Sequence, residues 1–484
     1  MLPMIEALYN APVYHLVLEA LLVIWVLRLL FRKSHSPKDR VILTEAEKDE
    51  LIAEWKPEPL VPPVDPMHPA LHPRIVTGKA MKTVTVDGRD CLNFSTHNYL
   101  GLIGNTDVEL AAIKCLEKYG VGSCGPRGFY GTTDVHLDLE DMIAKFMHCE
   151  EAVLYSYSFA TIASAIPAYA KRGDIIFADM NVNFAIQKGL DASRSNIIFF
   201  RHNDMNHLEE LLESQAKADL RVGSCQTAKL NCFQHASLFQ DPKKAAVTRK
   251  FLIVEALYMN SGDICPLPEL VELKRKYKLR FFVDECLSIG VLGASGRGVF
   301  EFFNMSVNEA DLICGSLEYC LGSLGGFCVG SSYVVDHQRL SGLGYCFSAS
   351  LPPLLAAGAM ASFSFLESNA GKEALLHLEN ICKTAHSLFN ELLLDLEQSK
   401  HSSPNSPIKH LYAKDHDDPE DFLQSVVKMV EEKAIAIVTA TYLEKEEKFC
   451  PAPSIRIALA SHHVEEDVRH LISVLNEATS ALSC

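Results

Sequence analysis

Residues 120–140 read GVGSCGPRGFYGTTDVHLDLE and form the most distinctive stretch of this 484-residue chain. Glycine occupies five of the first twelve positions. Because glycine reaches positive φ without steric cost and lets other groups approach the backbone closely, such a loop suits a place where the chain meets a substrate or another subunit. A glycine-rich loop by itself is a weak signal, so the sequence on either side decides what it means.

The sequence around this loop predicts an α/β fold. Short apolar runs rich in β-branched residues predict strands, and stretches with helical periodicity lie between them. The predicted strands cover residues 151–155, 174–177, 196–200, 250–254 and 280–283, and two of the helices cover 208–216 and 267–277. Such alternation is typical of a mostly parallel sheet covered by helices.

The pattern changes after residue 350, where mainly helices are predicted. We expect a large domain over residues 85–350 and a smaller α+β domain over 351–484. The length of the chain allows two such packed domains. Residues 219–249 fit neither periodicity and are locally basic, so we interpret them as a loop insertion in the large domain.

The amino-terminal residues 13–31, VYHLVLEALLVIWVLRLLF, form one long apolar stretch. As a helix they span about 28 Å, close to the thickness of the hydrocarbon core of a bilayer. Glu19 opposes insertion, while Arg28 can reach the nearby interface. No basic segment precedes the stretch and no small-residue cleavage site follows it, which favours a membrane-spanning helix over a signal peptide. A buried core helix is the other interpretation.

Basic residues predict the orientation of this helix. They crowd its carboxyl side at Arg28, Arg32, Lys33, Lys38 and Arg40, whereas the first twelve residues contain no Lys or Arg. The positive-inside rule then predicts a single-pass anchor with a short luminal tail over residues 1–12 and the bulk of the chain in the cytosol. Residues 32–84 follow as a proline-containing linker and an amino-terminal arm.

The composition narrows the classes of partner. The net charge is −16, from 61 acidic and 45 basic residues, with no concentrated basic stripe, so no nucleic-acid partner is expected. The fifteen cysteines include no C-x-x-C spacing. Their odd number is typical of reduced thiols in the cytosol, and no metal centre is predicted.

Further motifs lie in order along the chain. They are NYLGL at residues 98–102, GDICPLPE at 262–269, VDE at 283–285, SIGVLG at 288–293, FSASLPP at 347–353 and SIR at 454–456. Together with the glycine-rich loop they resemble the α-oxoamine synthases, pyridoxal-phosphate (PLP) enzymes that condense an amino acid with an acyl-CoA and release carbon dioxide. The resemblance covers residues 85–480 and implies fold type I of the PLP enzymes, with active sites at a dimer interface.

The same resemblance shows that the cofactor lysine is missing. Its position is held by Tyr319, within SLEYCLGSLGG at residues 316–326, and no lysine occurs between Lys278 and Lys372. A phenol cannot form a Schiff base with the cofactor. We therefore expect no catalytic residue in this chain.

Two other family positions have also lost their chemistry. Leu287 and Asn183 stand where the family has histidines. Residues 156–162, SYSFATI, lack the glycine and asparagine of the family's phosphate-side element. Asp284 remains at the position of the carboxylate that pairs with the pyridinium nitrogen, and we interpret it as vestigial.

One branch of the family divides its active site between two subunits, and this chain is similar to the subunit that lacks the lysine. That branch condenses L-serine with palmitoyl-CoA to 3-oxosphinganine, releasing carbon dioxide and CoA. The resemblance implies a noncatalytic but required subunit at the endoplasmic reticulum membrane, with PLP bound covalently by a lysine-bearing catalytic subunit. Small membrane activator and regulatory subunits are further partners. The alternative is a membrane-anchored scaffold that does not line the active site.

Within this resemblance, Cys124, Arg127 and Phe129 face the shared site from the glycine-rich loop. Arg127 and Phe129 either line the acyl-CoA entrance or pack at the interface. Cys124 replaces a family glycine, and we interpret it as a structural residue in preference to a reactive thiol.

Ser348 and Ser350 are expected to donate hydroxyl hydrogen bonds to the PLP phosphate of the partner. Arg456 stands where the family binds the substrate carboxylate. Because this chain has no lysine to hold the cofactor, we expect a structural role for Arg456.

Overall fold

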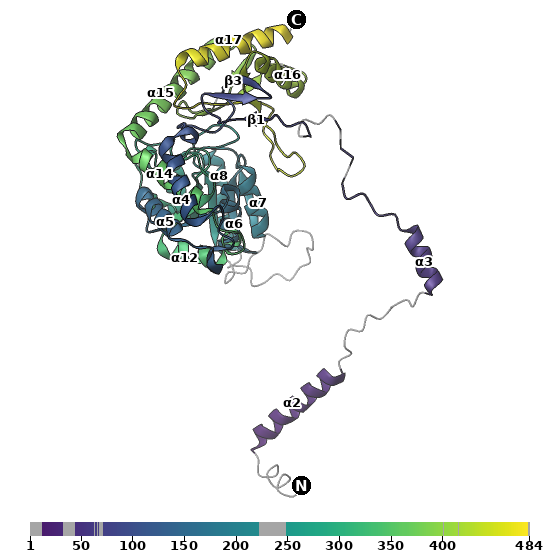
Figure 1. Ribbon diagram of the computed structural model, residues 1–484. Helices are drawn as coiled ribbons and strands as arrows, with labels where there is room; N and C mark the ends of the chain where they lie inside the picture. The colour runs from purple at the N-terminus through teal and green to yellow at the C-terminus, as the bar shows by residue number, and fades with distance from the viewer. Residues whose placement is uncertain are drawn as a thin grey trace. The chain divides into compact units, whose positions relative to one another are not determined.

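The computed structural model describes residues 12–31, 44–61, 63–64, 66, 71–221, 248–399, 401–414 and 416–482. The chain divides into two units, Met1–Pro73 and Arg74–Cys484. The first unit contains the helices α2 (Val13–Phe31) and α3 (Glu45–Glu54), drawn in purple in Figure 1. Most of the expected luminal tail and most of the expected loop insertion at 219–249 lie outside the described residues.

Helix α2 has the bounds that the apolar pattern predicts. It is 19 residues long, and its most apolar 18-residue window is not buried in the structure. By length and composition it could therefore cross a membrane. Helix α3 begins with a capping box, in which Thr44 Oγ1 accepts from the backbone N–H of Glu47 at 3.3 Å and the Glu47 carboxylate accepts from the Thr44 N–H at 2.8 Å.

The second unit is built on a seven-stranded sheet. Its order is β4 (Glu151–Tyr155), β10 (Gly326–Gly330), β9 (Leu312–Ser316), β8 (Arg280–Asp284), β7 (Lys250–Glu255), β5 (Ile175–Asp179) and β6 (Asn196–Phe200). Every pairing is parallel except those of β10 with β4 and β9. The predicted mostly parallel sheet is confirmed, and β9 and β10 are the strands that the pattern did not reveal.

Helices pack around this sheet, and its inner strands are buried along almost their whole length. Because these strands are buried on both faces, their sequences are continuous apolar runs instead of alternating apolar and polar residues. The helices and short turns are η2 (Leu102–Gly104), α4 (Thr106–Tyr119), η3 (Arg127–Gly131), α5 (Asp134–Met147), α6 (Ser158–Tyr169), α7 (Phe184–Ser193), α8 (Met205–Arg221), α10 (Leu267–Tyr277), α11 (Val299–Phe302), η4 (Val307–Glu309), α12 (Ser332–Ser341), α13 (Leu343–Cys346) and α14 (Pro353–Glu367).

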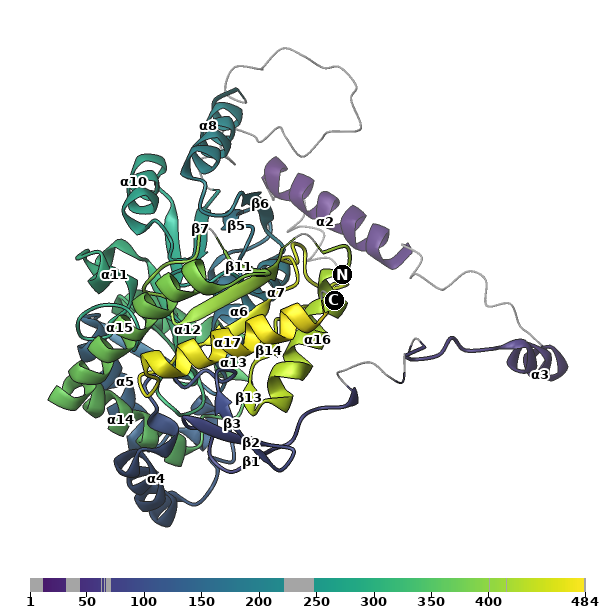
Figure 2. The ribbon, with the colours of Figure 1, turned by 90° about the horizontal axis from the view of Figure 1, so that it is seen from above.

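The carboxyl-terminal part carries a second sheet, β11 (Leu396–Gln398), β12 (Ile408–Ala413), β15 (Ile455–Ala458) and β14 (Val438–Thr439), in which all pairings are antiparallel. Its helices are α15 (Asn369–Leu392), α16 (Pro419–Glu432) and α17 (Glu465–Leu482). In Figures 1 and 2 these helices lie together at one end of the unit. The predicted α+β character of this part agrees with these elements.

Residues 76–93 pair with this carboxyl-terminal part. Strands β1 (Val76–Thr77), β2 (Thr83–Val86) and β3 (Arg89–Asn93) form a third sheet that ends on β13 (Ile435–Ala436). The pairing joins residues more than 300 positions apart in the sequence. Residues 74–484 form one unit, and the boundary expected at residue 350 stays a prediction.

A bridging histidine links three segments beside the sheet. His202, which follows β6, places Nδ1 at 2.9 Å from Asp179 Oδ1 and Nε2 at 2.7 Å from Asp263 Oδ2. Only an imidazolium can donate from both ring nitrogens. Burial alone lowers the pKa of His202, but the hydrogen bonds and charges of Asp179 and Asp263 outweigh it and raise this pKa to about 9.

We predict that this bridge makes stability depend on pH. The pKa of His202 in the folded chain lies above its unfolded value of about 6.5, so the stabilisation is complete below that pH and is lost as the pH rises through about 9. The upper bound is about 3 kcal/mol. His202→Gln should flatten the fall of the thermal unfolding midpoint between about pH 6.5 and 9.

The exposed histidine of α17 provides the control, because His470→Gln removes an imidazole outside this bridge. That variant should retain the wild-type pH dependence. Parallel unfolding curves for wild type and His202→Gln across the same pH range would contradict the prediction.

Candidate functional site

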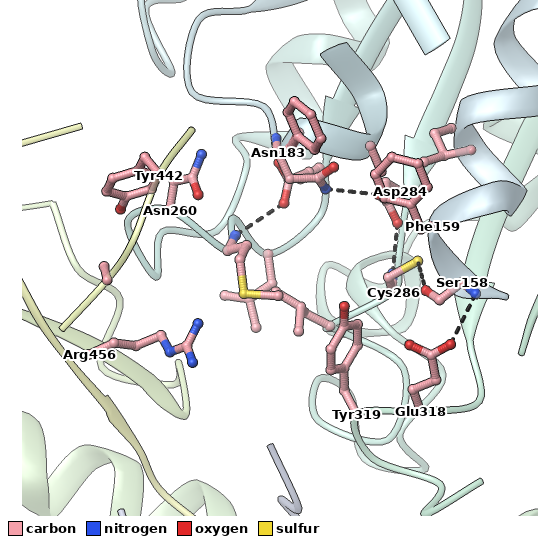
Figure 3. Close-up of a pocket in the computed structure, with 18 of the residues that line it drawn as sticks. Ser158, Phe159, Asn183, Asn260, Asp284, Cys286, Glu318, Tyr319, Tyr442 and Arg456 are labelled. Atoms are coloured by element: carbon pink, nitrogen blue, oxygen red, sulfur yellow. Dashed lines mark hydrogen bonds between the residues drawn. The ribbon is translucent and has the colours of Figure 1, made fainter. Parts of the chain in front are cut away.

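A cavity of 460 Å³ opens where three parallel strands end. Strand β7 ends at Glu255, β8 at Asp284, and β9 leads directly into Glu318 and Tyr319, all of which line the cavity. The carboxyl ends of parallel strands are the usual ligand sites of α/β sheets. Figure 3 shows Arg456 pointing into the same space from the opposite wall, on β15.

Five family positions singled out by the sequence analysis line this cavity. Asn183, Asp284, Leu287, Tyr319 and Arg456 all line it, although they come from widely separated segments. The first four belong to the ends and loops of the large sheet, while Arg456 comes from the second sheet. The structure therefore brings all five residues into one site.

Two neighbouring carboxyl groups lie on the sheet side of the cavity. Glu255 and Asp284 are register partners on β7 and β8. Asn183 contacts both, donating its backbone N–H to Glu255 Oε1 at 2.5 Å and its amide Nδ2 to Asp284 Oδ2 at 3.2 Å. Burial, and then the charge of Asp284, raise the pKa of Glu255 to about 8. Burial also raises the pKa of Asp284, so the pair does not hold two full charges at neutral pH.

Tyr319 places a neutral phenol in the cavity. Its ring meets the edge of His97 with centroids 5.2 Å apart. Burial raises the pKa of the Tyr319 hydroxyl, and neighbouring acidic groups add to that effect. Leu287 brings only a hydrocarbon side chain to the same lining. None of these groups can act as an amine nucleophile.

Arg456 is a cation of the cavity wall. Among the described residues its guanidinium makes no hydrogen bond or ion pair, and its Nε is buried. Its charge acts on His410 nearby, whose pKa burial lowers to about 4 with a further contribution from Arg456. We expected a structural role for Arg456, but among the described residues no hydrogen bond or ion pair of its guanidinium supports that role.

Glu318 is a cavity residue that sequence reasoning missed. Its Oε1 accepts from the backbone N–H of Ser158, the first residue of α6, at 3.0 Å, and from the N–H of Gly325 at 3.3 Å. Figure 3 shows the Ser158 contact. The available signal was an acidic residue directly before the lysine position, in a loop of otherwise small and apolar residues.

The glycine-rich loop is bound to its own chain outside this cavity. Arg127 is buried and forms a bidentate pair with Glu140, at 2.7 and 3.0 Å. Loop closure requires glycine at Gly131, where a Cβ atom would collide with the carbonyl of Gly125. The Arg127 guanidinium thus holds the loop, and the expectation that Arg127 lines the acyl-CoA entrance or packs at the interface stays a prediction.

Ser350 is hydrogen-bonded within its own chain. Its hydroxyl donates to the carbonyl of Gly131, its N–H donates to the carbonyl of Gly125 at 2.9 Å, and its own carbonyl accepts from Ser123 Oγ at 2.9 Å. The Ser350 hydroxyl therefore joins residue 350 to the glycine-rich loop, and its expected role toward the PLP phosphate of the partner stays a prediction. Ser348 is half-buried, and its expected role stays a prediction.

Apolar side chains are exposed around this loop. Turn η3 contacts α13, and α13 contacts α6. The exposed side chains on and next to these elements are Phe129, Tyr130, Tyr157, Phe159, Leu343 and Phe347, and we call them the apolar rim. Phe129 is 70% and Phe347 77% exposed. Cys124 is exposed as well, with a φ of 58°. Such a group of large apolar side chains marks an interaction surface.

The fold is shared with proteins of a known class. A family model described as aminotransferase class I and II matches residues 89–475. A serine palmitoyltransferase from Sphingomonas wittichii has a TM-score of 0.71 at 24% identity, with 90% of this chain and 96% of that chain covered. A serine palmitoyltransferase variant from S. paucimobilis, with a bound PLP–myriocin aldimine, has a TM-score of 0.71 at 23% identity, with 85% and 93% covered.

Relatives of similar length define the family more narrowly. Serine palmitoyltransferase 1 of Dictyostelium discoideum is 40% identical over 475 residues, covering 96% of this chain and 94% of the relative. Long chain base biosynthesis protein 1 of Arabidopsis thaliana is 38% identical over 487 residues, covering 98% and 93%. The chain belongs to this family of serine palmitoyltransferase 1 and long chain base biosynthesis protein 1. Its context is therefore sphingolipid base synthesis and a PLP-dependent acyltransferase.

The residues of this cavity do not fit PLP. Tyr319 offers no amine for a covalent bond, and the Glu318 carboxylate already accepts from the first N–H of α6, that of Ser158. A phosphate placed there would meet a like charge. Asp284 is still present but is hydrogen-bonded to Asn183 and to the Cys286 N–H.

Proposed function

We propose that this chain is the noncatalytic but required subunit of a heterodimeric serine palmitoyltransferase. The assembly condenses L-serine with palmitoyl-CoA to 3-oxosphinganine in the first step of sphingolipid synthesis. The observation that carries the proposal is Tyr319, a half-buried neutral phenol at the point where β9 opens into the cavity. Catalysis in this family uses PLP chemistry, so the lysine and the covalently held PLP belong to a partner subunit.

The apolar rim supports a partner of this kind. It surrounds the glycine-rich loop and reaches Tyr157 and Phe159, which also line the cavity. A related subunit docked on this rim would bring its own site close to the loop. Within the proposal, Cys124 and Phe129 form part of the wall of that shared site, and Arg127 and Ser350 hold the loop from behind.

The first prediction from this proposal concerns activity. The chain purified alone should release no CoA from palmitoyl-CoA and L-serine and show no aldimine absorbance, whereas co-expression with a lysine-bearing subunit should give both. The control is an assembly in which the partner's lysine is replaced, which should form but remain inactive. Activity or an aldimine band from this chain alone would overturn the proposal.

The second prediction separates a subunit that lines the site from a membrane-anchored scaffold. The contacts that hold Arg127 and Ser350 would serve a scaffold equally well, so the test needs an exposed loop residue. Cys124→Trp adds a large side chain to the loop surface and should lower the kcat/KM of the assembly roughly tenfold, because small displacements of substrate are costly. Cys450→Trp, at the other exposed cysteine of the described residues, should leave it unchanged. Equal kinetics for both variants would favour the scaffold.

We also propose that α2 anchors the chain in the endoplasmic reticulum membrane, with residues 32–484 in the cytosol. The support is its length and exposed apolar surface, together with the basic residues that follow it. In this arrangement small activator and regulatory membrane subunits would bind near the anchor.

Alkaline carbonate extraction tests the anchor. The full-length chain should stay in the membrane pellet, and Ile24→Arg should shift it toward the supernatant, because a central arginine opposes insertion by about 2.5–3.5 kcal/mol. Ile52→Arg, on the exposed surface of α3, is the matched control and should behave as wild type. Release of the wild-type chain by carbonate would contradict the proposal.

A further inference from the structure

The contacts of Glu318 show an anion held at the amino terminus of a helix. The residue lies in a turn that follows β9 and that is closed by the Leu317 N–H donating to the carbonyl of Gly325 at 2.9 Å. From this turn its carboxylate accepts from the Ser158 N–H at 3.0 Å and from the Gly325 N–H at 3.3 Å. One carboxylate oxygen therefore joins α6 to the turn.

The start of α6 needs an acceptor that its own cap does not supply. Helix α6 has 12 residues, and Tyr157 at its N-cap makes no capping hydrogen bond through its side chain. The first N–H groups of a helix lack intrahelical partners and carry a partial positive charge, so they favour an anion. Glu318 is that anion, and it reaches the helix across 160 residues of sequence.

This occupancy conflicts with the ligand of the related fold. Solved structures of the same fold have PLP bound, and PLP carries a phosphate. In this chain two N–H groups beside the cavity, those of Ser158 and Gly325, are already hydrogen-bonded to the Glu318 carboxylate. A phosphate could enter only by displacing Glu318 or by approaching its like charge.

We propose that Glu318 is a built-in anion that closes this cavity to phosphate-bearing ligands. This effect is separate from the missing lysine. Glu318 acts at the start of α6, where a phosphate would bind, whereas Tyr319 replaces the amine that would bind the cofactor covalently. Restoring an amine by Tyr319→Lys therefore does not reopen the cavity to a phosphorylated ligand. Glu318 also stabilises the start of α6 without any bound cofactor.

The test measures the binding of inorganic phosphate to the full-length chain, purified with its membrane anchor in detergent. Glu318→Ala removes the negative charge and frees the N–H groups of Ser158 and Gly325. It should raise the affinity for phosphate about tenfold or more, which corresponds to the usual strength of a charge-assisted hydrogen bond. Glu318→Gln keeps the shape of the side chain and removes only its charge. It should give a smaller gain, and it carries the test if Glu318→Ala fails to fold.

Glu447 provides the matched control within the same cavity. Its carboxylate accepts from the Leu443 N–H at 2.8 Å and makes no contact with α6. Glu447→Gln should leave phosphate affinity unchanged. An equal gain for Glu447→Gln would mean that only the net charge of the cavity matters, and that result would overturn the proposal.

Hydrogen exchange gives a second readout that needs no activity. In wild type, the protection of the backbone amides around Ser158 should not respond to added phosphate, whereas in Glu318→Gln it should increase with phosphate. Equal phosphate affinity in wild type and both Glu318 variants, or a phosphate response in wild type, would overturn the proposal. Neither measurement depends on whether the chain supports acyl transfer with a partner.

Discussion

The common ending of β7, β8 and β9 is the constraint on which the cavity depends. Because these strands are parallel and in register, Glu255 lies opposite Asp284, and the turn with Glu318 and Tyr319 opens beside them. Parallel strands need long crossover connections, and here those connections are helices whose starts surround the same edge. A shift of one residue in register would turn every one of these side chains to the opposite face of the sheet.

The acidic groups of the cavity are stabilised by this chain's own groups. Burial, and then the charge of Asp284, raise the pKa of Glu255. Glu318 is stabilised by N–H groups, including one at the positive end of a helix. Arg456 remains the cation of the opposite wall, and nothing among the described residues pairs with it. One side of the cavity is therefore held by the hydrogen bonds of Glu318. On the other side, the Arg456 guanidinium has no partner among the described residues.

The glycine-rich loop shows why the chemistry of a residue does not determine the direction of its side chain. Arg127 and Ser350 have polar groups suited to a ligand, yet both are buried against their own chain. Phe129 and Phe347, which apolar character alone would place inside, are exposed. The difference arises from close packing at Gly131, which brings the loop against residue 350 and leaves the aromatic side chains outside.

The sequence by itself determined the α/β fold, helix α2 and the loss of the lysine at Tyr319. These features depend on local periodicity or on the identity of one residue. The sequence did not predict strands β9 and β10, because their cysteine and glycine residues interrupt the run of β-branched residues that indicates a strand. Only the tertiary structure decided that β3 pairs with β13, that Arg127 faces inward and that Glu318 accepts from the start of α6. Each of these contacts joins groups whose meeting depends on packing in three dimensions, which local sequence patterns do not encode.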